Sequence, residues 1–232
     1  MRLLTRPKGN TKFKKSHVRI YGLSLAPAKM ASSTTVCPSS TPGCRATCLV
    51  FSGMAQAFPM VLHGRILKTQ LFFSNQEKFM VTLNNEIASV KHREGRRKLA
   101  FRLNVFSDIA WETIPDSPIV RFPHVQFYDY TKIPSRYEKF LAGQNWPANY
   151  HLTFSRSEKN EKECLDFLRM GGTVSLVYDR HSPIETYLGF PVAEGDSTDY
   201  RPDDPPGHWI GLRSKGTLKI RATAEKLGFA IS

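Results

Sequence analysis

The sequence predicts an α/β protein whose largely parallel sheet forms a partial TIM-like barrel. Strand-like runs alternate with helices or long connections along the chain, which is the arrangement typical of parallel sheets. The chain has 232 residues, of which 41% are hydrophobic, so it can bury a sizeable core. Because several such strands follow in succession, we expect a barrel or a part of one.

The first strand is expected within the stretch VRIYGLSLAP, which Pro27 ends. From Pro59 to His92, apolar residues recur at three- and four-residue spacing, which predicts two helices with a break near Ser74. Four more strand-like runs follow, namely KLAFRLNVFSD, HVQFYDYT, NYHLTFS and GTVSLVYD. A helix, KNEKECLDFLRM, lies between the last two runs, and Gly171 is a favourable signal for its end.

Two terminal segments are expected to lie outside this barrel domain, which spans residues 18–181. Residues 1–17 are rich in Lys and Arg and have few apolar residues, so we interpret them as a flexible basic arm or a solvated tail. Residues 182–232 begin with a stretch rich in Gly, Pro and Asp. We expect an irregular or small β appendage there, packed on the barrel.

The charge balance points to a polyanionic partner. The chain has 33 Lys and Arg residues against 20 Asp and Glu residues, with a net charge of +13, which favours DNA or RNA. No apolar run approaches the roughly 20 residues of a membrane span, and no apolar segment of a secretory signal follows the basic N-terminus. We therefore expect a cytoplasmic protein with no membrane association, and the sequence does not indicate its oligomeric state.

Polar residues stand at the ends of the expected strands. In parallel α/β folds the carboxyl ends of strands carry the functional groups, because the connecting loops converge on one face. We expect these side chains to meet at one mouth of the barrel, with Asp179 at the end of the last run. The candidate substrate-binding residues are Arg102, Asn104, Ser107, Tyr130, Thr131, Ser155 and Arg156.

Asp108, Asp129 and Lys132 are the candidate catalytic residues at the same mouth. A carboxylate at the end of a strand can act as a base, as a nucleophile or as a group that positions the ligand. The alternative is that each aspartate caps a helix or closes a turn. Lys132, like Arg156, has the charge to hold a phosphate or a carboxylate.

Cys37, Cys44 and Cys48 lie close together in the loop VCPSSTPGCRATC. A reducing compartment disfavours disulfides, so a metal site is the more probable use of three clustered thiols. Three thiolates hold zinc if His63 or Cys164 is the fourth ligand, and they also hold a [4Fe–4S] cluster with one iron left open. The alternative is that the three thiols are unrelated.

Several stretches together resemble the phage "gene product 88" family. They are SLAPAKMASSTTVCPSSTPGCRATC, FRLNVFSDI, FYDYTK, NYHLTFSRS and GFPVAEGDSTDYRPDDPPGHWIGLRSKG, and they cover most of the chain from about Leu23 to Gly216. That family is similar in layout to radical-SAM barrels, with a cysteine loop after the first strand. The resemblance implies a partial TIM-like barrel that holds a metal or a cluster, in the host cytoplasm if a phage encodes it. The usual radical-SAM spacing is C-x3-C-x2-C, whereas this chain has C-x6-C-x3-C.

These observations give one leading function and two alternatives. We expect a nucleic-acid-directed enzyme with an iron–sulfur site at the three cysteines and with S-adenosylmethionine as a possible co-substrate. A zinc enzyme resembling the guanine transglycosylases, with Asp108 and Asp129 as paired carboxylates, is the first alternative. The second is a non-catalytic phage factor that binds DNA or a host protein and has a structural metal.

Overall fold

The structure is a computed structural model that describes residues 1–51, 57–178 and 184–231. Its strands are β1 (Leu4–Thr5), β2 (Arg19–Leu23), β3 (Leu99–Arg102), β4 (Gln126–Thr131), β5 (Tyr150–Ser155), β6 (Val174–Tyr178), β7 (Thr186–Tyr187), β8 (Phe190–Glu194), β9 (Trp209–Arg213) and β10 (Ala230–Ile231). Its α-helices are α1 (Thr11–Lys14), α2 (Pro42–Ala46), α4 (Pro59–Ser74), α5 (Gln76–Glu94), α6 (Pro118–Arg121), α7 (Pro134–Ala142), α8 (Glu161–Arg169) and α9 (Leu218–Lys226). Short 3-10 helices span Pro7–Gly9, Leu49–Phe51, Trp111–Thr113 and Arg201–Asp203.

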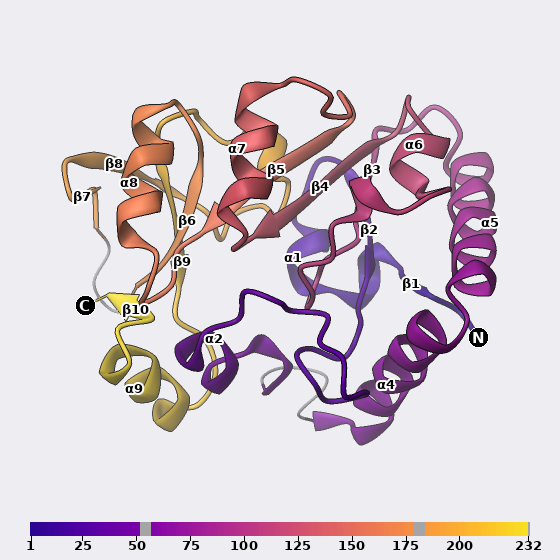
Figure 1. The fold of residues 1–232 in the computed structure, drawn as a ribbon, viewed down its shortest axis with the longest axis horizontal. Coiled ribbons are helices and arrows are strands. Elements are labelled where there is room, and N and C mark those ends of the chain that lie inside the picture. The colour runs from indigo at the N-terminus through magenta and orange to yellow at the C-terminus, as the bar shows by residue number, and fades with distance from the viewer. Residues whose placement is uncertain (52–56, 179–183, 232) are drawn as a thin grey trace.

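The described strands form one large and mostly parallel sheet (Figure 1). The strand order is β1-β2-β3-β4-β5-β6-β9-β8-β7, and β10 pairs with β6. From β2 to β8 every neighbouring pair is parallel, whereas β1 and β7 join the two ends of the path in antiparallel pairs. The predicted α/β class with a largely parallel sheet is therefore confirmed. Among the described strands the path ends at β1 and β7, so it does not close on itself.

Local signals in the sequence explain where the helices begin and end. The predicted break between the two long helices lies at Asn75, whose side chain accepts a hydrogen bond from the N–H of Lys78 and so caps α5. Beyond α8, Gly171 adopts a φ of 82°, a left-handed conformation that glycine tolerates well. The chain then turns directly into β6.

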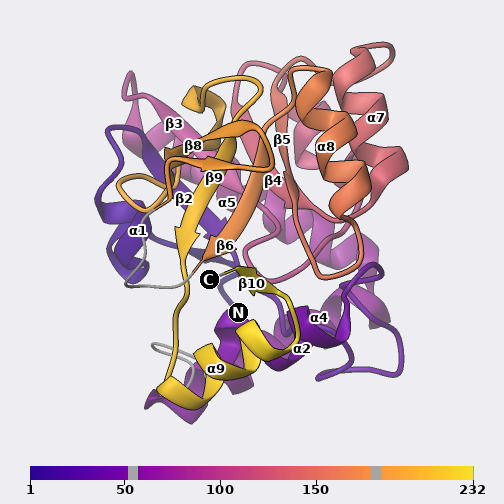
Figure 2. The same cartoon turned by 90° about the vertical axis from the view of Figure 1, so that its left-hand side faces the viewer.

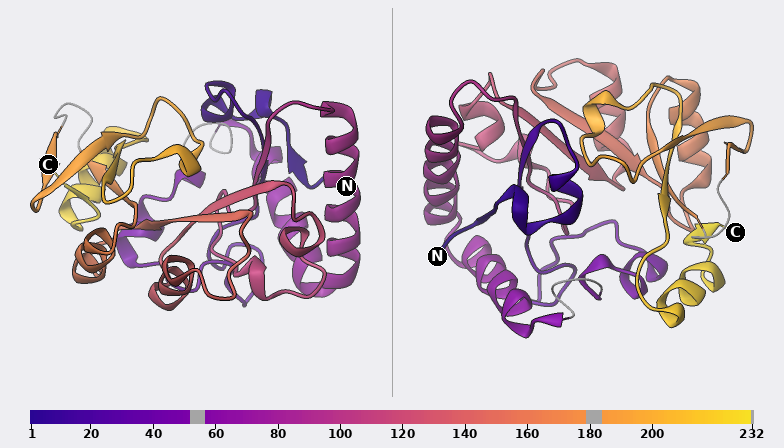
Figure 3. Two further views of the ribbon diagram at one scale, coloured as in Figure 1. Left: turned by 90° about the horizontal axis from the view of Figure 1, so that it is seen from above. Right: turned by 180° about the vertical axis from the view of Figure 1, so that it is seen from behind.

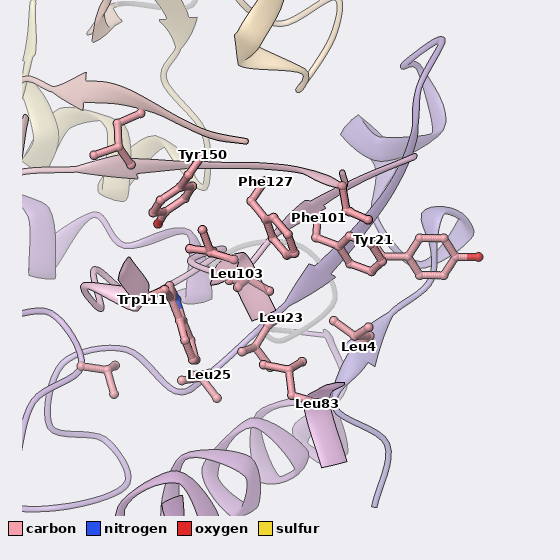
Figure 4. Close-up of a cluster of buried hydrophobic side chains, with 14 of the residues drawn as sticks. Leu4, Tyr21, Leu23, Leu25, Leu83, Phe101, Leu103, Trp111, Phe127 and Tyr150 are labelled. Atoms are coloured by element: carbon pink, nitrogen blue, oxygen red, sulfur yellow. The ribbon is translucent and has the colours of Figure 1, made fainter. Parts of the chain in front are cut away.

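The main core lies between the sheet and the helices α4, α5, α7 and α8, and Figure 4 shows some of its side chains. Aromatic residues of adjacent strands pack side by side, with ring centroids 5.9 Å apart for Tyr21 and Phe101 and 5.7 Å apart for Phe101 and Phe127. Leu83 of α5 is fully buried in the same cluster. This packing fixes the strands whose carboxyl ends carry the candidate site.

Residues 1–17 pack on the fold, which differs from the expected flexible arm. Strand β1 pairs with β2, and Leu3, Leu4 and Phe13 are 3% exposed or less. The right-hand view of Figure 3 shows the indigo N-terminal segment lying against the neighbouring strands. The physical reason is that a few large apolar side chains, placed among the cations, contribute enough buried surface to order the segment.

The C-terminal segment also belongs to the sheet and is not an appendage. Strand β9 lies between β6 and β8 and is parallel to both, and β10 pairs with the last two residues of β6. Figure 2 shows α9 beside α2, near the ends of β6 and β9. The C-terminal segment therefore lies next to the cysteine loop.

Candidate functional site

A cavity of about 360 Å³ lies at the carboxyl ends of the parallel strands. The loop after β2, the loop after β3 and the ends of β4, β5, β6 and β9 all contribute to its wall. Its lining is mostly apolar, with aromatic side chains from Phe51, Phe106, Tyr130 and Phe229. A concave, mostly apolar site with a few convergent polar groups is the usual form of a small-molecule site.

Most of the residues that the sequence singles out line this one cavity. They are Cys37, Cys44, Cys48, Arg102, Asn104, Ser107, Asp108, Tyr130, Thr131, Lys132 and Ser155. The expectation that the strand ends converge therefore agrees with their positions. The notable exceptions are Asp129 and Arg156, and Asp179 lies outside the described residues.

The cysteine loop is held in place at both of its ends. Cys37 Sγ lies 3.4 Å from the N–H of Ala28, from which it accepts a hydrogen bond, and 3.4 Å from the carbonyl oxygen of Phe106, to which it donates. Cys44 lies in α2, whose first turn is capped by the hydroxyl of Thr41. These contacts present the thiols on one wall of the cavity.

Burial favours the protonated thiol at Cys37 and at Cys48. Burial, with smaller contributions from the neighbouring Cys48 and Cys44, raises the pKa of Cys37 to about 11, against the hydrogen bond from Ala28. Burial also raises the pKa of Cys48, while the charges of Lys132 and Arg65 act in the opposite direction. A bound metal ion or cluster would offset this cost, because its own charge favours the thiolate.

The thiols share a wall without forming a compact set of ligands. Within residues 1–51, 57–178 and 184–231, no group of three or more His, Cys, Asp or Glu side chains is arranged to hold a metal ion. His63, the predicted fourth zinc ligand, is exposed on α4. Cys164 is fully buried in the core, and its thiol lies 3.6 Å from the Asn160 side-chain oxygen. The donor chemistry of three thiols suits a thiolate-bound group, and neither His63 nor Cys164 lines the cavity with them.

Asp108 lies at the centre of a charged network on the cavity wall. Its Oδ1 accepts a hydrogen bond from Arg136 Nη1 at 3.0 Å, and its Oδ2 accepts one from the N–H of Lys132 at 2.8 Å. Arg136 also binds Glu112 through Nε and Nη2. Burial raises the pKa of Asp108 against the opposing effects of Arg136 and Lys132. Lys132 Nζ lies 2.7 Å from Ser155 Oγ, so these polar strand ends are directly connected.

Asp129 is 0% exposed and supports the loop that follows β3. Its Oδ1 accepts a hydrogen bond from the N–H of Asn104 at 2.6 Å, and its Oδ2 accepts one from Tyr150 Oη at 2.9 Å. Asn104 Oδ1 in turn accepts hydrogen bonds from Ser107, Ile109 and Trp111. The geometry gives Asp129 a positioning role through Asn104 and does not place it in contact with the cavity.

Arg156 is also directed away from the cavity. Its guanidinium binds Glu161 and donates hydrogen bonds to the carbonyl oxygens of Gly228 and Phe229. It therefore fastens the C-terminal segment to the end of β5. Phe229 then contributes to the cavity wall.

The terminal segments bring to the cavity several cations that were not predicted from the sequence. Lys12, Arg213 and Lys215 line it together with Asp199. The sequence offers a hint for two of these residues. Lys12 stands next to the apolar Phe13, and Lys215 lies in the stretch GLRSKG, which is part of the family resemblance. Neither hint shows that the N-terminal or the C-terminal segment folds onto the cavity.

Comparison with known proteins identifies the family. The chain matches the family "Gene product 88" over residues 2–231, so it belongs to that family. No curated protein and no solved structure matches it. In the described part of the chain, no helix is both long enough and apolar enough to span a membrane.

Proposed function

We propose that this member of the gene product 88 family is a radical-SAM-like enzyme that modifies nucleic acid and holds an iron–sulfur cluster on Cys37, Cys44 and Cys48. The observation that carries the proposal is the shared location of the three thiols. They come from the loop after β2 and line one cavity with the polar ends of the following strands. That is the place where parallel α/β enzymes carry their chemistry.

The arrangement of the thiols favours a cluster over a single zinc ion. A zinc site needs a fourth ligand besides three thiolates, and neither His63 nor Cys164 lines the cavity with Cys37, Cys44 and Cys48. A cubane cluster accepts thiolates at different iron atoms, so its ligands lie further apart. Three thiolates leave one iron open for a substrate or co-substrate.

The cluster would supply one-electron chemistry, with S-adenosylmethionine as the proposed co-substrate. Around it, the residues of this chain have separate tasks. Asp108, fixed by Arg136 and by the N–H of Lys132, is placed to accept or position a substrate proton at its carboxylate. Lys132 and Ser155 are joined at 2.7 Å and offer a donor and a hydroxyl at the same wall.

The charge of the protein supports a nucleic acid as the substrate. The chain carries a net charge of +13, and cations predominate among the charged residues that line the cavity. Long-range attraction of a polyanion raises its association rate and its local concentration. The cavity volume of about 360 Å³ is sufficient for a small molecule or one unstacked nucleotide, but not for a duplex.

The proposal is tested by incubating reduced, cluster-loaded protein anaerobically with S-adenosylmethionine and with DNA or RNA. Mass spectrometry of the digested nucleic acid then reports any modified nucleoside. We expect the Cys44→Ala variant to lose the modification and the Cys164→Ala variant to keep it. Of these two residues, Cys44 lines the cavity and Cys164 is buried in the core. Full activity of Cys44→Ala, or no modification of either nucleic acid by the loaded wild type, would contradict the proposal.

A further inference from the structure

We propose that Lys12, Arg102 and Lys215 form a phosphate-binding subsite at one side of the cavity, which recognises a phosphate group of the substrate. The inference deepens the proposed function, since it assumes that the cavity receives the substrate. It rests on different residues from the cysteine loop. Two of the three come from segments that the sequence analysis places outside the barrel.

Arg102 supplies a directed donor at the carboxyl end of β3. Its Nη1 lies 3.1 Å from both carboxylate oxygens of Asp199, and its guanidinium packs over the Tyr130 ring, 4.5 Å from the centroid. Its Nε is buried and has no hydrogen-bond partner among the described residues. A buried N–H without a partner is unfavourable, so a ligand that accepts from this guanidinium would be stabilised.

Lys12 and Lys215 supply two point charges that share one acidic partner. Lys12 Nζ lies 2.9 Å and Lys215 Nζ lies 3.0 Å from the same oxygen, Asp196 Oδ1. One carboxylate cannot neutralise both ammonium groups. Burial lowers the pKa of Lys12, and the neighbouring charge of Lys215 acts in the same direction, against the opposing effects of Asp196 and Asp199.

The cations at this side of the cavity exceed the carboxylates that face them. Lys12, Lys215 and Arg102 form direct ion pairs with Asp196 and Asp199, and Arg213 adds a further cation to the wall. Lys132 and Arg45 also line the cavity, and each donates there to a neutral group, the Ser155 hydroxyl and the Ser40 carbonyl. The cavity wall therefore carries a net positive charge, and Lys12, Lys215 and Arg102 are the members of it that gather around Asp196 and Asp199.

A phosphate fits this set better than a carboxylate does. A phosphate offers several oxygens that can accept from a guanidinium and from two ammonium groups at once, and as a monoester it carries up to two negative charges. The aromatic rings of Phe106 and Tyr130 also line the cavity and can pack against the remainder of the ligand. A substrate with a phosphate and a flat apolar body, such as a nucleotide, satisfies both parts of the wall.

Isothermal titration calorimetry can test the subsite with three probes: a nucleoside monophosphate, the matching nucleoside without phosphate, and citrate as a carboxylate. We expect the monophosphate to bind at least tenfold more tightly than the nucleoside or citrate. Lys12→Gln and Lys215→Gln should each weaken monophosphate binding about tenfold. The matched control is Lys14→Gln, an exposed lysine of the same short helix, which should bind as the wild type does.

Three outcomes would overturn the subsite: equal binding of nucleoside and monophosphate, citrate binding as tight as that of the monophosphate, or unchanged binding in Lys12→Gln and Lys215→Gln. Thermal melting of each variant shows whether it is folded, and Arg102→Lys provides a further variant that keeps the charge but loses the guanidinium fork.

Iron analysis of the same samples separates the phosphate subsite from the proposed cluster. Phosphate binding that depends on Lys12 in protein unable to hold iron would refute the cluster and leave the subsite intact.

Discussion

The carboxylate of Glu158 accepts a hydrogen bond from the backbone N–H of Gly43 at 2.8 Å, so the end of β5 is tied to the cysteine loop. The same carboxylate accepts a second hydrogen bond from the hydroxyl of Thr41 at 2.7 Å. Burial opposes ionisation of Glu158, but these two donors outweigh it and hold its pKa below the usual range. The loop that carries the thiols is thus fixed by an ionised side chain from a distant part of the chain.

Replacing Glu158 with Ala is expected to loosen the cysteine loop. The change leaves the N–H of Gly43 and the hydroxyl of Thr41 without their acceptor, which should lower the free energy of unfolding by about 1–3 kcal/mol. We also expect a lower iron content per chain after reconstitution. Urea denaturation and iron analysis measure the two effects. The exposed neighbour Lys159, changed to Ala, should alter stability by less than about 0.5 kcal/mol, and iron retention equal in both variants would refute the role of Glu158.

Asp129 should make the stability of the protein depend on pH. Burial raises its pKa to about 7, against the opposing hydrogen bond from Asn104 and the charge of Arg136. The folded state therefore binds a proton at this carboxyl more tightly than the unfolded chain does. The contribution of Asp129 to stability should rise as the pH falls from about 7 towards the ordinary value of 3.8, by up to ~1.4 kcal/mol per pH unit.

The measurement is urea denaturation at a series of pH values, for the wild type and for Asp129→Asn. Because Asn does not titrate, the variant should lack this part of the pH dependence. The difference between the two curves isolates the contribution of Asp129 from those of other groups. Parallel curves across this pH range would show that the folded and unfolded states bind its proton equally.

Arg136 should be among the most costly charged residues to remove. Its side chain is 4% exposed and joins Asp108, Glu112 and Tyr150. Arg136→Ala leaves two carboxylates without their cation, with an expected loss of about 3–5 kcal/mol in the free energy of unfolding. Arg169, which pairs with Asp166 on the surface of α8, is the control, and its change to Ala should cost less than about 1 kcal/mol. Similar losses for the two variants in chemical denaturation would contradict this account.

The N-terminal segment should contribute to stability through its apolar side chains. Phe13 is 2% exposed and packs against a second core cluster with Ile20 and Tyr128. Phe13→Ala is expected to destabilise the protein by about 3–5 kcal/mol, whereas Lys15→Ala, an exposed change nearby, should have little effect. Thermal and urea denaturation distinguish this arrangement from a flexible arm, for which both changes would be neutral.

The central strands and the largely parallel sheet could be predicted from the sequence, because each strand is a run of apolar residues that ends in polar ones and helices or long connections separate the runs. The same rule brings Cys37, Asp108 and Lys132 to one mouth without any knowledge of their contacts. Residue type and spacing were sufficient to predict the strands and the convergence of their polar ends. These predictions required only that parallel strands end on the same side of a sheet.

The remainder depends on contacts between distant segments, which local patterns do not encode. Strand β9 lies within a stretch rich in Gly and Pro, and only its pairing with β6 and β8 makes it a central strand. Asp129 and Asp108 both belong to polar strand ends in the sequence. Asp129 nevertheless lies within β4, where the N–H of Asn104 and the hydroxyl of Tyr150 bind its two oxygens. Lys12 reaches the cavity because β1 and Phe13 anchor the segment around it.

The most direct test of the central claim is the iron and acid-labile sulfide content of protein reconstituted without oxygen, for the wild type and for Cys37→Ala, Cys44→Ala, Cys48→Ala and Cys164→Ala. The proposed site predicts about four irons per chain in the wild type and in Cys164→Ala, with broad visible absorption. Each of the other three variants should lose the iron and the colour. A wild type without iron, or iron that remains in all three loop variants, would contradict a cluster held by Cys37, Cys44 and Cys48.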